Sequence, residues 1–271
     1  MNDMLEKLYA AKARARAADE VRESIDVLRE RAVNRIAERR AFRAGLEGSQ
    51  GPAIIAEIKR ASPSKGLIVH QLDPAKIAQR YGAAGADAIS VLTESDHFLG
   101  DLAYLDAARA AAALPIMRKD FLTEPYQVVQ SAAHGADAII AIVAGLDDAT
   151  IRALLEEAQR WRLDVLVEIH DERELERALA LGATLLGINN RDLRTFETSL
   201  AVAEELLPRI PRSVLAISES GIGSPEDTKA LVDAGARGFL IGESLMRAED
   251  PAELIRAIKA AQPISPATAV R

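Results

Sequence analysis

Polar and charged side chains recur at the ends of short apolar runs in this sequence. In residues 53–59, alternation places Glu57 and Lys59 on one face, and Lys119 ends a later run in the same way. Buried carboxylates and ammonium groups are costly unless they are paired or used in chemistry. One such charge usually marks a structural ion pair, but five such runs predict an acid–base site. The polar positions that end these runs are Glu57, Lys59, Lys119, Glu168, Asn189, Arg191, Glu219 and Ser220.

Short β-rich runs alternate with longer amphipathic runs from Pro52 onward, and these elements must position the polar residues. Several helical runs begin with a capping residue and a proline, as at Asp73-Pro74. Eight strands alternating with eight helices predict a (β/α)8 TIM barrel, whose site lies at the carboxyl ends of the strands. The predicted strands are 53–59, 88–93, 115–119, 138–143, 165–169, 185–189, 214–218 and 238–241. The predicted helices are 74–84, 102–113, 125–134, 147–160, 172–181, 200–207, 225–234 and 251–261.

The first fifty residues do not follow this alternation. The segments Met4–Ala18 and Val21–Arg43 are charged and favour helices, with apolar residues spaced along them. We therefore predict a helical extension, residues 1–50, packed on a barrel domain, residues 51–271. The pattern leaves two interpretations open: a solvated appendage, or additional helices that cover the active-site end of the barrel.

Glycines and serines after the last two predicted strands form a second candidate site. Residues 220–224 read Ser-Gly-Ile-Gly-Ser, and residues 242–244 read Gly-Glu-Ser. Small residues let backbone N–H groups approach an anion, and these two loops commonly hold phosphate in a (β/α)8 barrel. Glycines are also common in tight turns, but the position of both segments favours a phosphate site.

Composition excludes several classes of function. The 271 residues carry a formal net charge of −7 and include no cysteine. Nucleic acid and anionic membranes are therefore not expected partners, and disulfides and thiolate nucleophiles are excluded. Residues 1–20 lack the apolar segment of a secretory signal, and no apolar run approaches the roughly 20 residues of a membrane span, so we expect a cytoplasmic protein. We expect no metal and no cofactor, because the four histidines lack ligand spacing and no nucleotide-binding fingerprint is present. His170 is expected to cap or pack.

Five motifs resemble the indole-3-glycerol-phosphate synthase family. They occur in the family's order, and the resemblance extends from the N-terminal helices to the last barrel helix. The runs Glu57-x-Lys59-x-x-Ser62 and Asn189-x-Arg191-Asp-Leu are long and chemically unusual enough to be specific. The motifs are IAEIKRASPS at 55–64, RKDF at 118–121, VEIH at 167–170, GINNRDL at 187–193 and SESGI at 218–222.

The resemblance implies a reaction and roles for the site residues. 1-(2-Carboxyphenylamino)-1-deoxyribulose 5-phosphate would close to indole-3-glycerol phosphate, with loss of carbon dioxide and water, in tryptophan biosynthesis. No metal or organic cofactor is implied. Lys119 would be the general acid that activates the carbonyl group, and Glu168 the acid–base partner in dehydration. The sequence leaves open whether Lys59 or Lys119 is the principal proton donor. Lys59 would be a second cation that lowers the pKa of Lys119 and contacts the substrate. Glu57 and Asn189 would orient these groups.

The same resemblance assigns substrate-binding positions. Phe121 would pack on the anthranilate ring, and Arg191 suits an anionic group. Glu243 stands where a small hydroxyl residue often helps to hold phosphate; its carboxylate would repel phosphate, so we expect only its backbone N–H to take part. The full set expected to bind substrate is Ser62, Phe121, Arg191, Glu219, Ser220, Gly221, Leu240, Gly242 and Glu243.

Two rival functions remain at the level of sequence. Another phosphate-binding barrel, such as phosphoribosylanthranilate isomerase or the α subunit of tryptophan synthase, would share the phosphate loops but not the set of Lys59, Lys119 and Glu168. A barrel that only binds a partner would gain nothing from several buried charges. We expect a phosphorylated small-molecule substrate and a monomer, and association with other tryptophan-pathway enzymes stays open.

Overall fold

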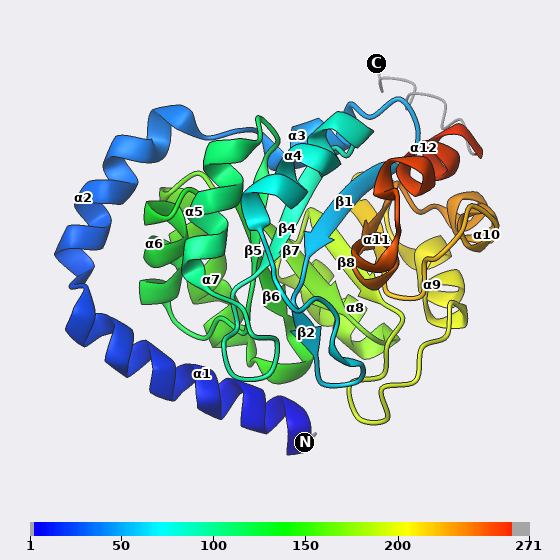
Figure 1. The fold of residues 1–271 in the computed structure, drawn as a ribbon. Coiled ribbons are helices and arrows are strands. Elements are labelled where there is room, and N and C mark those ends of the chain that lie inside the picture. Colours follow the sequence, from blue (N-terminus) through cyan, green and yellow to red (C-terminus); the bar gives the residue numbers. More distant parts are fainter. Residues whose placement is uncertain (1–2, 262–271) are drawn as a thin grey trace.

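The computed structural model describes residues 3–261, within which eight parallel strands close into a barrel surrounded by helices (Figure 1). The strand order β1-β10-β9-β8-β7-β6-β5-β4 follows the chain around the barrel and returns to β1. The predicted (β/α)8 barrel is therefore confirmed. Residues 262–271, which the predicted barrel domain included, lie outside the described part of the chain. The barrel strands are β1 Ala53–Ile58, β4 Ala88–Leu92, β5 Ile116–Lys119, β6 Ala138–Ile142, β7 Asp164–Ile169, β8 Leu185–Asn189, β9 Leu215–Glu219 and β10 Gly238–Ile241.

Helices around the barrel begin and end within two residues of the predicted positions. Local capping explains several of the starts, because the side chains of Asp73, Asp147 and Asp171 each accept a hydrogen bond from a backbone amide in the first turn. The barrel helices are α4 Pro74–Ala84, α5 Leu102–Ala111, α6 Pro125–Ala133, α7 Asp148–Arg160, α8 Glu172–Ala180, α9 Ala201–Leu206, α10 Glu226–Ala234 and α12 Pro251–Ala261. None of the helices within residues 3–261 combines the length and apolar character needed to cross a bilayer.

A hairpin and a short helix that were not predicted follow barrel strands. A hairpin of β2 (Ala61–Ser62) and β3 (Gly66–Leu67) lies in the loop after β1. Helix α11 (Glu243–Arg247) follows β10 directly. Because the carboxyl ends of the strands meet at one end of the barrel, both elements lie where the site was predicted.

The N-terminal extension forms three helices, α1 (Asp3–Arg22), α2 (Ile25–Arg35) and α3 (Phe42–Glu47), with a short 3-10 turn η1 (Ile36–Glu38). The predicted segment 21–43 is thus divided. The side chain of Ser24 caps the start of α2, and extended backbone at Arg39 and Ala41 separates α3 from it.

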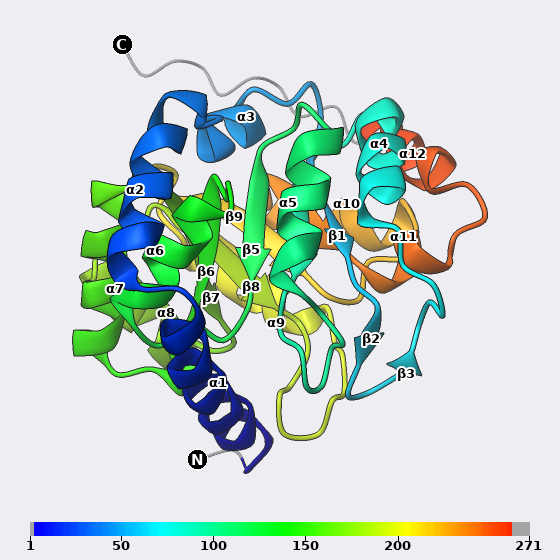
Figure 2. The ribbon, with the colours of Figure 1, turned by 60° about the vertical axis from the view of Figure 1, so that its left-hand side comes forward.

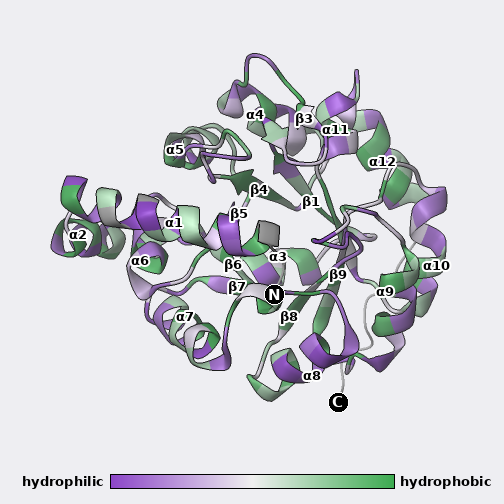
Figure 3. Cartoon of the chain, turned by 90° about the horizontal axis from the view of Figure 1, so that it is seen from below, coloured by the Kyte–Doolittle hydropathy of each residue, from purple (hydrophilic) through white to green (hydrophobic). Residues whose placement is uncertain are grey.

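The three N-terminal helices occupy different parts of the barrel surface (Figures 1 and 2). Leu5 and Leu8 of α1 line the cavity at the carboxyl end of the strands. Helix α2 packs on α6 at the side. At the amino end, α3 buries Phe42 and Leu46 in the barrel interior. Only α1 therefore covers the active-site end, and Figure 3 shows it reaching from the rim toward the barrel axis.

The apolar core has two layers, as strand alternation requires. Along β1, Ile54, Ala56 and Ile58 face the surrounding helices, whereas Ile55 faces the barrel interior. The same alternation places Glu57 inside the barrel near its carboxyl end. The sheet thus fixes which side chains can reach the site.

Candidate active site

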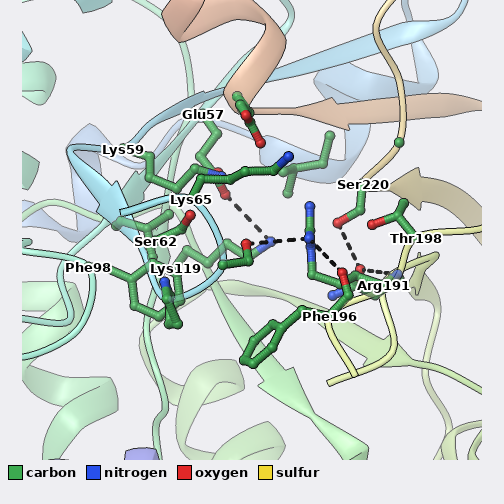
Figure 4. Close-up of a pocket in the computed structure, with 18 of the residues that line it drawn as sticks. Glu57, Lys59, Ser62, Lys65, Phe98, Lys119, Arg191, Phe196, Thr198 and Ser220 are labelled. Atoms are coloured by element: carbon green, nitrogen blue, oxygen red, sulfur yellow. Dashed lines mark hydrogen bonds and ion pairs between the residues drawn. The ribbon is translucent and has the colours of Figure 1, made fainter. Parts of the chain in front are cut away.

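Side chains from several barrel strands converge on one cavity of about 850 Å³ at the carboxyl end of the barrel (Figure 4). Glu219, at the end of β9, is fully buried and lies behind Lys119, with which it pairs. The other predicted site residues line the cavity. They are Glu57, Lys59, Ser62, Lys119, Phe121, Glu168, Asn189, Arg191, Ser220, Gly221, Leu240, Gly242 and Glu243.

One ammonium group faces three carboxylates at the bottom of this cavity. Lys119 Nζ donates to Glu219 Oε2 at 2.6 Å, and it lies 3.5 Å from Glu57 Oε2 and 3.8 Å from Glu168 Oε2. We call these four residues the Lys119 cluster. Burial alone lowers the pKa of Lys119, but attraction to Glu219, Glu57 and Glu168 outweighs it and raises the pKa above its usual value. Lys119 is therefore held in the charged form, the form of a general acid.

Glu219 is the least stabilised carboxylate of the Lys119 cluster. Burial raises its pKa to about 7 against the opposing effect of Lys119, and repulsion from Glu168 adds to the increase. Within residues 3–261, its Oε1 atom is buried and has no hydrogen-bond partner. Gly187 on the neighbouring strand β8 makes room for this atom, because a Cβ at position 187 would overlap it.

Lys59 pairs with Glu57 at the edge of the cluster. The Nζ–Oε1 distance is 2.7 Å, and the pKa of Glu57 is lowered because Lys59 and Lys119 outweigh the effect of burial. The expectation of a lowered pKa at Lys119 is wrong, because the surrounding carboxylates outweigh burial, and the nearby cation Lys59 is itself paired with Glu57. A side chain at Gly242 would overlap Glu57 Oε1, so glycine leaves the space for this pair.

Glu168 is held from the side opposite Lys119. Asn189 Nδ2 donates to Glu168 Oε1 at 3.1 Å, and His170 Nε2 lies 3.4 Å from the same oxygen. Burial raises the pKa of Glu168, but His170, Lys119 and Asn189 outweigh it and lower the pKa to about 2. The contact with His170 differs from the expectation that this residue merely caps or packs.

Asn189 also organises the loops after β8 and β9. Its Oδ1 atom accepts hydrogen bonds from Ser220 Oγ at 2.9 Å and from the backbone N–H of Arg191 at 3.1 Å. The guanidinium of Arg191 donates to the carbonyl of Phe196 at 3.0 Å and stays at the cavity wall (Figure 4). Arg191 therefore presents a positive charge to whatever fills the cavity.

An aromatic surface forms another part of the wall. The ring of Phe121 lies 6.0 Å from that of Phe98, tilted by 38°, and 5.6 Å from that of Tyr9 in an edge-on arrangement. A planar aromatic substituent can pack beside Phe121 and Phe98.

The glycine-rich loops after β9 and β10 lie side by side at the cavity. Ser220 and Gly221 have positive φ angles of 63° and 84°, a backbone that turns sharply after the strand. The amides of Gly223 and Ser224 donate to Asp227 Oδ2 at 2.9 Å and 2.8 Å, so these two amides are already engaged.

The side chain of Glu243 is paired within its own helix. Its Oε1 atom accepts from Arg247 Nε at 3.0 Å, one turn further along α11. That only the backbone N–H of Glu243 takes part in phosphate binding stays a prediction.

Several cavity residues were missed because they lie in loops or outside the barrel. Loop sequences have no periodicity that indicates which side chain points inward. The missed lining residues include Leu5, Leu8, Lys65, Phe98, Phe196 and Arg247. In the described part of the chain, no group of three or more His, Asp or Glu side chains is placed to hold a metal ion.

A charged lysine among carboxylates, at the carboxyl end of a closed parallel barrel, defines a class: this is a (β/α)8-barrel enzyme equipped for proton transfer. The comparison with known families then identifies the family of barrel enzymes to which the chain belongs. The family model described as indole-3-glycerol phosphate synthase matches residues 5–258. The chain belongs to the indole-3-glycerol phosphate synthase family.

Individual relatives agree over nearly the whole chain. A protein of Polaromonas sp. (strain JS666) named indole-3-glycerol phosphate synthase is 48% identical over 256 residues, covering 93% of this chain and 96% of the relative. A protein of the same name from Bordetella pertussis is 46% identical, covering 95% and 100%. Thiamine phosphate pyrophosphorylase from Pyrococcus furiosus has a TM-score of 0.59 at 14% identity, covering 78% of this chain and 95% of that one, and shows likeness of fold alone.

Proposed function

We propose that this enzyme converts 1-(2-carboxyphenylamino)-1-deoxyribulose 5-phosphate to indole-3-glycerol phosphate, carbon dioxide and water. The observation that carries this proposal is the Lys119 cluster: a charged lysine and a buried carboxylate, Glu168, face one cavity from two strands. This is what ring closure followed by dehydration requires. Family membership supports the same reaction.

Ring closure needs an acid. The aromatic carbon that bears the carboxylate attacks the ribulose carbonyl carbon, and the carbonyl oxygen takes a proton. We assign this proton to Lys119, whose Nζ is charged and reaches the cavity. Carbon dioxide then leaves, and its bonding electrons restore the aromatic ring.

Dehydration needs a base that can return a proton. Glu168 accepts the proton of the carbon next to nitrogen and passes it to the departing hydroxyl group, which leaves as water. Because the substrate carboxylate is ionised and leaves as neutral carbon dioxide, the whole reaction consumes one proton. This proton comes from solvent and restores the charged form of Lys119. The low pKa of Glu168, about 2, keeps it in the carboxylate form before the step.

Binding roles follow from the cavity wall. Phe121 and Phe98 suit the anthranilate ring, and Lys59 and Arg191 suit the carboxylate or hydroxyl groups. The backbone around Ser220–Gly221 and Gly242–Glu243 suits the phosphate. Leu240 and Ser62 also line the cavity.

The direct test adds the carboxyphenylamino-deoxyribulose phosphate to purified protein without metal and follows indole-3-glycerol phosphate by fluorescence. Lys119→Ala should lower kcat by about 10²–10⁴-fold, the usual contribution of a general acid. Lys229→Ala is the control, because this exposed lysine of α10 pairs only with Asp233 in the described structure. Folded wild-type protein that gives no product would contradict the assignment, and isomerase activity on phosphoribosylanthranilate would then be assayed.

We further propose that the enzyme works as a monomer in the cytoplasm. A phosphorylated substrate does not cross membranes unaided, so the enzyme that consumes it acts in the compartment where it is made. Sedimentation velocity should give a single species of one chain at micromolar concentration. A dimer that persists on dilution would contradict this. Association with other tryptophan-pathway enzymes would appear only when they are added.

A further inference from the structure

A histidine lies between two acidic side chains directly beside the predicted base. His170 follows the end of β7, two residues after Glu168. Its Nδ1 atom lies 3.1 Å from Glu174 Oε2, and its backbone N–H donates to the same oxygen at 2.8 Å. Glu174, in the first turn of α8, therefore fixes both the ring and the backbone of His170.

This arrangement leaves the second ring nitrogen facing Glu168. His170 Nε2 is buried, lies 3.4 Å from Glu168 Oε1, and has no hydrogen-bond partner within residues 3–261. A buried donor without a partner is costly, and catalytic hydrogen bonds often shorten when substrate binds. A movement of a few tenths of an ångström would complete this one.

We propose that His170, oriented by Glu174, is a positioning residue that holds Glu168 in place as a carboxylate for the dehydration step. This inference rests on the proposed function. Glu168 Oε1 then lies between Asn189 and His170, while its Oε2 faces Lys119. The base is thus held by Asn189 of β8, His170 in the loop after β7, and Lys119 of β5.

The charges around His170 favour its protonated form. Glu168 and Glu174 face it from β7 and α8, and Lys119 and Asn189 lie beyond Glu168. Tyr9 of α1 lies near the same acids. Burial, and to a smaller extent the negative charges of Glu168, Asp120 and Glu174, raise the pKa of Tyr9, so its hydroxyl group stays neutral. Burial lowers the pKa of His170, but its contacts with Glu168 and Glu174 outweigh burial and raise it to about 10. The histidine is therefore a cation that lets two carboxylates remain ionised near each other.

The test compares substitutions of His170 with a matched histidine elsewhere. His134 is equally exposed, at 14%, and also contacts two acids, Asp106 and Glu23, on the side of the barrel. His170→Ala should lower kcat about tenfold, with KM within about twofold, and should shift the acidic limb of the kcat–pH profile upward by about one pH unit. The shift is upward because loss of the cation raises the pKa of Glu168.

His170→Gln separates geometry from charge. A glutamine can donate a hydrogen bond but carries no charge, so it should recover part of kcat and leave the acidic limb shifted. Glu174→Gln should move the limb in the same direction by less. His134→Ala should change neither kcat nor the limb. An unshifted profile in His170→Ala, or a loss of kcat that His134→Ala shares, would overturn the proposal.

Failure of the proposed function is distinguishable from failure of this inference. Wild-type protein is assayed first, and absence of turnover would count against the reaction alone. Carboxyl ¹³C NMR then follows the titration of Glu168 without substrate. A pKa of Glu168 that His170→Ala leaves unchanged would overturn the positioning role, and a pKa raised by about one unit would support it.

Discussion

Arg118 and Lys119 are consecutive residues of β5, and each belongs to a cluster of charged side chains. The two clusters differ in how many of their charged groups have hydrogen-bond partners. Lys119 points into the barrel, while Arg118 reaches helix α6 and Asp120 binds Lys12 of α1. The Arg118 cluster, which we define as Lys12, Thr93, Arg118 and Asp120, is buried. Arg118 donates to Asp120 at 2.8 Å, to Thr93 at 3.0 Å and to side chains of α6.

Hydrogen bonding separates the structural charges of one cluster from the catalytic charges of the other. Each nitrogen of the Arg118 guanidinium has an acceptor, and Asp120 has a much lowered pKa because Lys12 and Arg118 outweigh its burial. The Lys119 cluster instead has one ammonium for three carboxylates, an unpaired Glu219 Oε1, and an open cavity. Completeness of hydrogen bonding, rather than burial, distinguishes the two.

The largest effect is expected in the Arg118 cluster. Asp120→Ala should cost about 3–5 kcal/mol of unfolding free energy, because it leaves two buried cations without their shared acid. Urea denaturation measures the loss. Asp233→Ala, which removes an exposed partner of Lys229, should cost less than about 0.5 kcal/mol. If Asp120→Ala loses less than about 1 kcal/mol of unfolding free energy, the Arg118 cluster does not have the structural role that distinguishes it from the Lys119 cluster.

A side chain introduced beside Glu219 should displace its carboxylate in the Lys119 cluster and lower activity. Gly187→Ala places a Cβ where Glu219 Oε1 lies, so the carboxylate must move away from Lys119. We expect kcat to fall by about 10–100-fold, since small misplacements of catalytic groups are costly. Gly82→Ala in α4 has only an ordinary contact with Leu114 and should keep full activity. Equal activity of the two variants would argue against a role for Glu219.

Lys12 joins helix α1 to the Arg118 cluster and should give a smaller, mixed effect. Lys12→Met removes a charged hydrogen bond to Asp120, which Arg118 and Thr93 still satisfy, so about 1–3 kcal/mol of stability should be lost. KM should rise as well, because α1 carries Leu5 and Leu8 into the cavity wall. Arg14→Met, at an exposed position of the same helix, is the control. An unchanged KM would mean that α1 stays docked without this contact.

A pH dependence of stability is expected at Glu219. Its pKa in the folded protein, about 7, lies above the 4.5 of an unperturbed glutamate. Between these pH values the unfolded chain ionises Glu219 while the folded protein keeps its proton, so the folded state loses stability as pH rises. Glu219→Gln should therefore raise Tm relative to wild type more at pH 8 than at pH 5. If the difference in Tm between the variant and wild type is the same at pH 5 and pH 8, Glu219 is ionised over this whole range, like the neighbouring acids.

Strand periodicity made much of the site predictable. Glu57 and Lys119 end apolar strands, and the register of a parallel barrel brings such ends together whatever the loops do. Gly221 and Gly242 could be assigned to the site in the same way, because each follows the end of a predicted strand. The barrel and its helix positions followed from period and capping, with no tertiary information needed.

The remainder depends on contacts between segments that no local pattern encodes. His170 approaches Glu168 because Glu174 on α8 turns its ring, and the sequence shows only a histidine after a strand. The charge balance of Lys119 was misjudged because the pairing of Lys59 with Glu57 depends on side-chain geometry. Phe98 and Phe196 reach the cavity from loops.

The N-terminal extension also imposes an order on assembly. Lys12 binds an acid 108 positions later, and Arg43 of α3 binds Asp164 and Ser213, 121 and 170 positions later. At about 5–20 residues per second of synthesis, these partners are made many seconds after the helices that need them. Leu5, Leu8 and Phe42 have no final packing surface during that interval. The extension, which is made before the barrel, closes one end of it and borders the cavity at the other. It can therefore dock only after most of the barrel exists.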